Sequence, residues 1–142
     1  MSDIVVDASL ALQWCLDDES GRKYSLDVLT SLAEKRAVVP ILWFYEVGNG
    51  LIMAHRRKRI TLDQVNGFLL RLKALPIVAT QLSPADILEL PALAQKHGLT
   101  NYDAAYLAVA IRLDLPLATT DNSLRNAAAA AGVGTVAARE LR

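Results

Sequence analysis

The sequence is poor in cysteine and has no excess of charge of either sign. Cys15 is the only cysteine among 142 residues, which excludes an internal disulfide and a cysteine zinc cluster and favours a reducing, cytoplasmic location. The 15 Lys and Arg residues balance the 15 Asp and Glu residues, so a broad basic face for nucleic acid is not expected. The apolar run that starts at Ile4 ends at Asp7, so neither a secretion signal nor a membrane span is expected.

The composition is that of a compact globular protein. Hydrophobic residues make up 53% of the chain and charged residues 21%, which is too apolar for a disordered segment or a coiled coil. No repeat or break in composition divides the chain. We therefore expect a single domain over residues 1–142, with a core large enough to fold without disulfides or a structural metal.

Short apolar runs alternate with longer segments of helical periodicity. Five runs are predicted as strands: Ile4–Val6, Ala37–Val39, Ile77–Ala79, Leu115–Thr119 and Gly134–Val136. The alternation predicts an α/β fold, in which a parallel sheet is covered on both faces by helices.

Several helices carry recognisable start and stop signals. Thr61 and Gln64 have the spacing of a capping box, and Ser83 precedes a proline in the manner of an N-cap. Gly98 and Gly132 follow helical segments and are predicted to be left-handed caps.

Acidic residues fall where predicted strands end. Asp7 directly follows the first strand. Asp121 follows a later predicted strand, which ends at Thr119, after one intervening residue. Glu46 comes early in the segment 41–59, just after the strand that ends near Pro40, and Asp103 lies in the first turn of a predicted helix. Because ligands bind outside the carboxyl ends of the strands in open α/β sheets, we expect these acids to lie near one another, although the place of Asp103 is inferred less directly.

Each acid also has a purely structural explanation. Asp7 and Asp121 are suitable helix N-caps, and Thr100 with Asp103 resembles a capping box in which Asp replaces Glu. Glu46 could be an exposed acid favoured by the helix dipole. The functional interpretation rests on context, since Glu46 and Asp103 are set among apolar and aromatic residues, where a buried carboxylate needs a partner or a proton.

Carboxylates gathered at one edge would repel one another unless a cation lay between them. The candidate ligands are all oxygen donors, which favours Mg²⁺ or Mn²⁺ over zinc. Such a centre suits the hydrolysis of phosphodiesters by an activated water.

Four short motifs occur together, in order, along nearly the whole chain. They are Ile4-Val5-Val6-Asp7-Ala8-Ser9, Glu46-Val47-Gly48-Asn49, Tyr102-Asp103-Ala104-Ala105-Tyr106-Leu107-Ala108 and Leu117-Ala118-Thr119-Thr120-Asp121. Together they resemble the PIN-domain ribonucleases, in particular the VapC toxins of type II toxin–antitoxin systems. The resemblance implies a three-layer α/β/α fold with a central, mainly parallel sheet of about five strands.

The resemblance also implies a chemistry and a set of residues. It identifies an acidic quartet that holds one or two Mg²⁺ or Mn²⁺ ions and catalyses RNA hydrolysis, leaving 5′-phosphate and 3′-hydroxyl ends: Asp7, Glu46, Asp103 and Asp121. It assigns supporting polar roles to Ser9, Asn49 and Thr119. It further implies a VapB-like antitoxin partner and a homodimer, with no membrane association.

One dense basic run, His55-Arg56-Arg57-Lys58-Arg59, ends the segment that carries Glu46. Cations in the last turn of a helix complement its dipole, which explains the run structurally. Contact of Arg56, Arg57, Lys58 and Arg59 with RNA or with the antitoxin remains open.

Large apolar side chains are concentrated in the first half of the chain. We expect most of them to be core residues: Trp14, Trp43, Phe44, Tyr45 and Phe68. Because they exceed what one helix face needs, some could line a groove for an antitoxin peptide, to which the predicted helix Leu62–Leu75 could contribute.

The sequence therefore predicts a metal-dependent endoribonuclease toxin. The main alternative is a catalytically silent PIN-fold module that binds RNA or protein. A phosphoacceptor role for Asp7 is disfavoured, since no second Asp follows at Ser9 and no Lys follows a late strand. The RNA target is not encoded in any motif.

Overall fold

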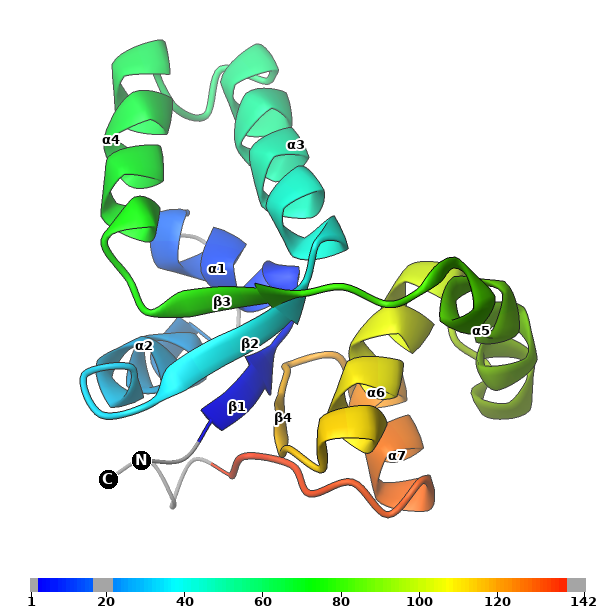
Figure 1. Cartoon of the computed structure of the whole chain (residues 1–142). Coiled ribbons are helices and arrows are strands. Elements are labelled where there is room, and N and C mark those ends of the chain that lie inside the picture. Colours follow the sequence, from blue (N-terminus) through cyan, green and yellow to red (C-terminus); the bar gives the residue numbers. More distant parts are fainter. Residues whose placement is uncertain (1–2, 17–21, 138–142) are drawn as a thin grey trace.

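The computed structural model describes residues 3–16 and 22–137 as alternating strands and helices (Figure 1). In order these are β1 (Asp3–Val6), α1 (Ala8–Cys15), α2 (Arg22–Ser31), β2 (Arg36–Pro40), α3 (Leu42–Arg56), α4 (Leu62–Lys73), β3 (Ile77–Thr80), α5 (Pro84–His97), α6 (Asn101–Leu113), β4 (Leu117–Ala118) and α7 (Asn122–Ala130). Among these residues, no helix combines the length and the apolar character that crossing a bilayer requires.

The strands form one parallel sheet in the order β3-β2-β1-β4. The predicted parallel sheet is confirmed, with four strands in the described residues. The predicted fifth strand, Gly134–Val136, forms only an isolated bridge between Thr135 and Leu117. Its pairing stays short because β4, the strand it would join, has only two residues and offers hydrogen bonds at Leu117 alone.

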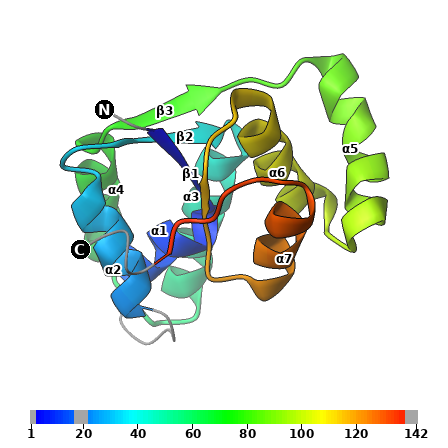
Figure 2. The ribbon, with the colours of Figure 1, turned by 90° about the horizontal axis from the view of Figure 1, so that it is seen from below.

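Alternating side chains of the strands enter two different cores. Ile4 and Val6 of β1 pack with Val28 and Leu32 of the α2 region on one face. Val5 faces the opposite way, into the larger core formed with α3, α6 and α7. Figure 2 shows the same division, with α2 and α7 on either side of the strands. The period of two along β1 thus produces the three-layer α/β/α arrangement that the motifs imply.

The helix boundaries follow the predicted capping signals with one exception. Thr61 and Gln64 form the full capping box of α4, Ser83 caps α5, and Gly98 takes a left-handed conformation with φ 66°. The segment 41–59 is not helical to its end, because α3 stops at Arg56 and Lys58 has φ 61°. The last residues of the basic run therefore lie in a turn.

The aromatic side chains of α3 divide between core and surface. Trp43 is buried, whereas Phe44 and Tyr45 are 44% and 74% exposed. These two are the exceptions to the expectation that most of the aromatic residues are core, because consecutive helical positions point in different directions and only one can face the sheet. Trp14 and Phe68 are partly buried and pack against the core.

Gly50 lets α3 approach α1 closely. A Cβ atom at this position would lie 2.6 Å from both terminal methyl carbons of Leu12, whereas a Cβ at Gly67 in α4 would meet no atom within 4 Å. We expect Gly50→Ala to destabilise the protein by about 1–2 kcal/mol through overpacking. The matched Gly67→Ala change should stabilise it by about 0.5–1 kcal/mol through helix propensity. Urea unfolding measures both effects, and equal stability of the two variants would contradict the close approach.

Candidate active site

Asp7 is the most buried of the four predicted acids, with 5% of its surface exposed. It follows β1 directly and caps α1, because its Oδ1 accepts hydrogen bonds from the backbone N–H of Leu10 at 3.2 Å and from the hydroxyl of Ser9 at 2.5 Å. Its Oδ2 accepts a hydrogen bond from the hydroxyl of Thr119. The strand end and the helix start therefore hold this carboxylate in one orientation.

Thr119 and Asp121 reach Asp7 from the neighbouring strand. Since β4 pairs in parallel with β1, its carboxyl end lies beside that of β1. The buried Thr119 hydroxyl donates to Asp7 and accepts a hydrogen bond from the backbone N–H of Asp121 at 3.0 Å. Asp121 is exposed and caps α7 through a 2.9 Å bond from the backbone N–H of Leu124.

Glu46 extends toward the same edge from the second turn of α3. It is half-buried, and its Oε1 accepts a 2.6 Å hydrogen bond from the hydroxyl of Tyr106 in α6. Tyr106 is only 1% exposed. The partner that a carboxylate needs among apolar neighbours is therefore a tyrosine, contributed by a helix 60 residues further along the chain.

Asp103 completes the group from the first turn of α6. Its backbone N–H donates to the Oγ1 of Thr100 at 3.1 Å, and its side chain is half-buried. The Thr100 cap sets the start of α6, and Tyr106 follows Asp103 by three residues. Residues three apart lie on one face of a helix, so α6 presents both Asp103 and the partner of Glu46 to the same edge of the sheet.

Burial and the charges of neighbouring acids raise the pKa of Asp7, Asp103 and Glu46. Burial raises the pKa of Asp7, and the charge of Asp121 adds to the effect, although the Ser9 and Thr119 hydrogen bonds oppose it. Burial, then the charges of Asp121 and Asp7, raise the pKa of Asp103. Burial also raises the pKa of Glu46 against the Tyr106 hydrogen bond, with contributions from Asp103 and Asp7. The quartet therefore lies within one electrostatic environment, as the strand-end pattern predicts.

The structural explanations are correct in part. Asp7 and Asp121 are N-caps, and Thr100 caps the helix that contains Asp103. Capping alone does not require Asp7 to be almost fully buried, nor to accept two side-chain hydroxyls besides the backbone N–H. The capping positions serve to fix the carboxylates at the edge of the sheet.

Two further residues at this edge have no role assigned from the sequence. Tyr106 lies within one of the quoted motifs, and its spacing from Asp103 was the available signal. Arg125 in α7 donates to the backbone carbonyl of Thr119 at 2.7 Å. It follows Asp121 by four residues, which places the two on one helical face. Arg125 thus fixes the loop between β4 and α7 that carries Thr119 and Asp121.

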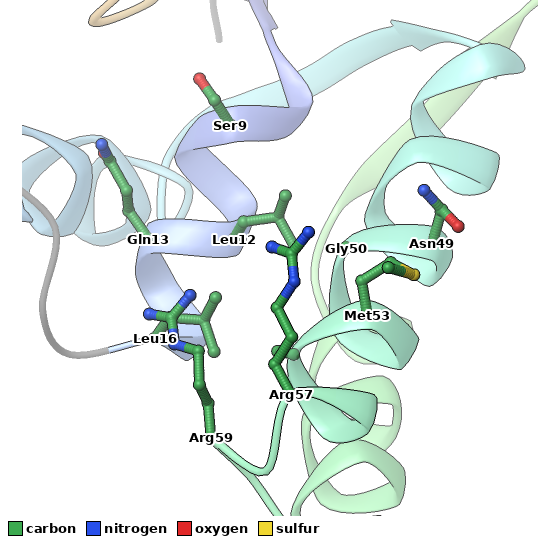
Figure 3. Close-up of a pocket in the computed structure, with 10 residues that line it drawn as sticks. Ser9, Leu12, Gln13, Leu16, Asn49, Gly50, Met53, Arg57 and Arg59 are labelled. Carbon is green, nitrogen blue, oxygen red and sulfur yellow. The ribbon is translucent and has the colours of Figure 1, made fainter.

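Ser9 and Asn49 lie where this acidic edge meets a pocket of about 420 Å³ between α1 and α3 (Figure 3). Arg57 and Arg59 of the basic run line the same pocket, whereas Arg56 and Lys58 do not. The pocket thus joins a residue hydrogen-bonded to Asp7 with two of the four predicted basic contacts.

The donor set fits a hard divalent cation in its chemistry. Four carboxylates and the hydroxyls of Ser9 and Thr119 offer oxygen atoms only, and mutual repulsion of the carboxylates favours a cation among them. Among residues 3–16 and 22–137, however, no three acidic, histidine or cysteine side chains already form a metal cluster. Oδ1 of Asp7 accepts two hydrogen bonds and Oδ2 accepts one, so Oδ2 keeps an acceptor site that an ion could use.

The fold and the site together define a class of protein. Acidic side chains gather at the carboxyl edge of a parallel sheet covered by helices on both faces, which is the ligand-binding edge of α/β proteins. The family model of the PIN domain matches residues 4–130, so the chain belongs to the PIN-domain family. Members of this family are generally nucleases that use divalent metal ions.

Solved structures share this fold at low sequence identity. The chain is similar to PAE2754 from Pyrobaculum aerophilum, with a TM-score of 0.70 and 23% identity over 99% of this chain and 93% of that one. It is also similar to FitAcB from Neisseria gonorrhoeae, with a TM-score of 0.64 and 18% identity over 96% and 98% of the two chains. For a toxin–antitoxin complex from Klebsiella pneumoniae the TM-score is 0.53, with 21% identity over 83% and 86%. No curated protein sequence matches the chain significantly.

The hydrogen bond from Tyr106 to Glu46 predicts a measurable stabilisation. We expect Tyr106→Phe to lower the free energy of unfolding by about 1–2 kcal/mol, because a buried bond to a charged acceptor is lost. Tyr102→Phe is the matched control, since Tyr102 is 61% exposed and lies on the same helix. Chemical denaturation compares the two variants, and an effect of equal size in both would argue against the bond.

The raised pKa of Asp103 predicts a dependence of stability on pH. A carboxyl whose pKa is higher in the folded state destabilises that state when ionised, and the penalty declines as the pH falls through the folded pKa. In EDTA at pH 7 we therefore expect Asp103→Asn to raise Tm by about 2–4 °C. The difference from the wild type should shrink at pH 5, as thermal unfolding at the two pH values would show.

Glu89→Gln serves as the control, because Glu89 is an exposed acid in α5. A Tm advantage of Asp103→Asn that is the same at both pH values, or that Glu89→Gln shares, would contradict the electrostatic cause.

Proposed function

We propose that this protein is a metal-dependent endoribonuclease and the toxin of a VapBC-type toxin–antitoxin pair. The observation that carries the proposal is the gathering of Asp7, Glu46, Asp103 and Asp121 at one edge of the sheet, where burial and the charges of neighbouring acids raise the pKa of Asp7, Glu46 and Asp103. That cluster costs stability unless it binds a cation, and a fold-stabilising role alone would not favour it.

We assign Asp7 and Asp103 as the principal ligands of Mg²⁺ or Mn²⁺, with Asp121 and Glu46 completing the site. When bound, such an ion supplies neutralisation of phosphate charge and activation of a water molecule. Neither His55 nor His97 is among the groups found at the acidic edge, so the carboxylates are the candidate proton acceptors.

The chain's own residues have separable tasks in this scheme. The hydroxyls of Ser9 and Thr119 orient Asp7, and Tyr106 orients Glu46. Asn49, one helical turn beyond Glu46 on α3, offers an amide to the substrate near the same edge. Arg125 donates a hydrogen bond to the Thr119 carbonyl and so restrains the residues that follow β4 next to Asp7.

An antitoxin partner and a homodimer belong to the same proposal. One of the similar solved structures is a toxin–antitoxin complex, which supports a protein partner for this chain as well. The exposed aromatic side chains of Phe44 and Tyr45 provide apolar surface beside the acidic edge for such contacts. We propose a cytoplasmic location on the same grounds.

The alternative is a silent PIN-fold module that binds RNA or protein. The capping roles of Asp7 and Asp121 favour it, because caps could be retained without catalysis. The two functions differ in what substitution of the acids does, since only catalysis requires the carboxylate charge.

Cleavage of RNA tests the proposal. We expect the purified protein to cleave single-stranded RNA with Mg²⁺ or Mn²⁺ and to lose this activity in EDTA. Asp7→Asn and Asp103→Asn should each lower the rate about 100-fold or more, because each removes a ligand charge. Glu89→Gln should retain the wild-type rate. Gel electrophoresis of labelled RNA measures all four proteins, and cleavage that persists in excess chelator, or in both Asn variants, would contradict the mechanism.

A further inference from the structure

The pocket between α1 and α3 has two chemically different ends. Ser9 and Asn49 form the end nearest Asp7, and Arg57 and Arg59 form the other (Figure 3). The walls between the two ends are formed by the apolar side chains of Leu12, Leu16 and Met53. No acidic residue of the described chain lines the pocket. Gly50, where α3 approaches Leu12 closely, also lines the pocket.

The structure separates the basic run into two pairs. Arg57 follows the last helical residue of α3, and the left-handed turn at Lys58 reverses the chain. Arg57, just before this turn, and Arg59, just after it, line the pocket, whereas Arg56 and Lys58 do not, although all four residues are exposed. The helix dipole alone would not distinguish Arg56 from Arg57, since both lie at the end of α3.

The guanidinium of Arg57 is available to a ligand. Figure 3 shows it extended from the end of α3 back toward Leu12 and the Ser9 end of the pocket. Within the described part of the chain its side chain forms no ion pair. A planar cation in a partly apolar pocket binds a phosphate through two parallel hydrogen bonds more strongly than a fully solvated cation does.

We propose that this pocket is a subsite for the RNA strand, in which Arg57 binds a backbone phosphate to one side of the bond to be cut. This inference rests on the proposed ribonuclease function and identifies how the same site holds its substrate. Asn49 in α3 and Arg57, the C-cap of this helix, are eight residues apart, about 12 Å along the helix axis, which a few nucleotides of a stacked strand span. The apolar walls would pack against riboses and bases.

The continuity of the pocket with the acidic edge favours RNA over an acidic peptide. A polyanion that occupies the Arg57 end reaches the Ser9 end, one hydrogen bond from Asp7, without passing an acidic side chain among the described residues that line the pocket. One phosphate can then lie at the carboxylates while the next few are neutralised by arginine. A single acidic side chain of a protein partner would use the arginine end alone and would not need the connection to the acidic edge.

Binding of a short, fluorescently labelled single-stranded RNA tests the subsite. All variants carry Asp103→Asn so that the RNA stays intact, and anisotropy is measured over a range of salt concentrations. We expect Arg57→Ala to weaken binding about tenfold and to lower the slope of log K against log salt by about 0.7, the loss of one phosphate contact to a single strand. Arg57→Lys should keep the slope.

Arg56→Ala is the matched control and should bind within about twofold of the parent, since Arg56 lies outside the pocket. If Arg57→Ala and Arg56→Ala have equal affinities and slopes, the subsite is wrong, and the pocket is free for a protein partner. Wild-type cleavage is scored separately. Cleavage without an Arg57 effect overturns the subsite alone, whereas Arg57-dependent binding without any cleavage overturns the nuclease proposal alone.

Discussion

The buried carboxylate of Asp7 is the constraint on which the site depends. It joins the ends of two adjacent strands, because it caps the helix after β1 and accepts the hydroxyl of Thr119 after β4. Burial raises its pKa, and only hydrogen bonds from Ser9, Thr119 and a backbone N–H oppose that shift. Holding an acid in this way costs stability. The other three acids of the quartet lie at the same edge of the sheet as Asp7.

The convergence of the acids could be predicted from the sequence because it follows from topology. Parallel strands end at one edge, so acids placed just after β1 and β4 must meet there. The hydrogen bond between Tyr106 and Glu46 could not be predicted in the same way, because it depends on how α3 and α6 pack across 60 residues of chain. Periodicity shows that a tyrosine is buried, and packing decides which polar group it finds.

Local sequence patterns predicted the lengths of strands and the ends of helices less well than the order of these elements. The run Gly134–Val136 has the composition of a strand, yet its pairing is limited by the two-residue β4 beside it. The basic run resembles a helix end, but the left-handed Lys58 ends it in a turn, and Arg57 and Arg59 on either side of Lys58 line the pocket. The placement of the charges, and not their count, puts a basic pocket next to the acidic edge in a chain of zero net charge.

The central claim is that the gathered carboxylates bind a divalent cation. Anomalous diffraction from crystals grown with Mn²⁺ tests it most directly, because the anomalous signal of manganese gives the position of the ion independently of any activity assay. We predict a strong peak within coordination distance of Asp7 and Asp103. Absence of a peak at the acidic edge at saturating Mn²⁺, or a peak elsewhere on the molecule alone, would contradict the claim.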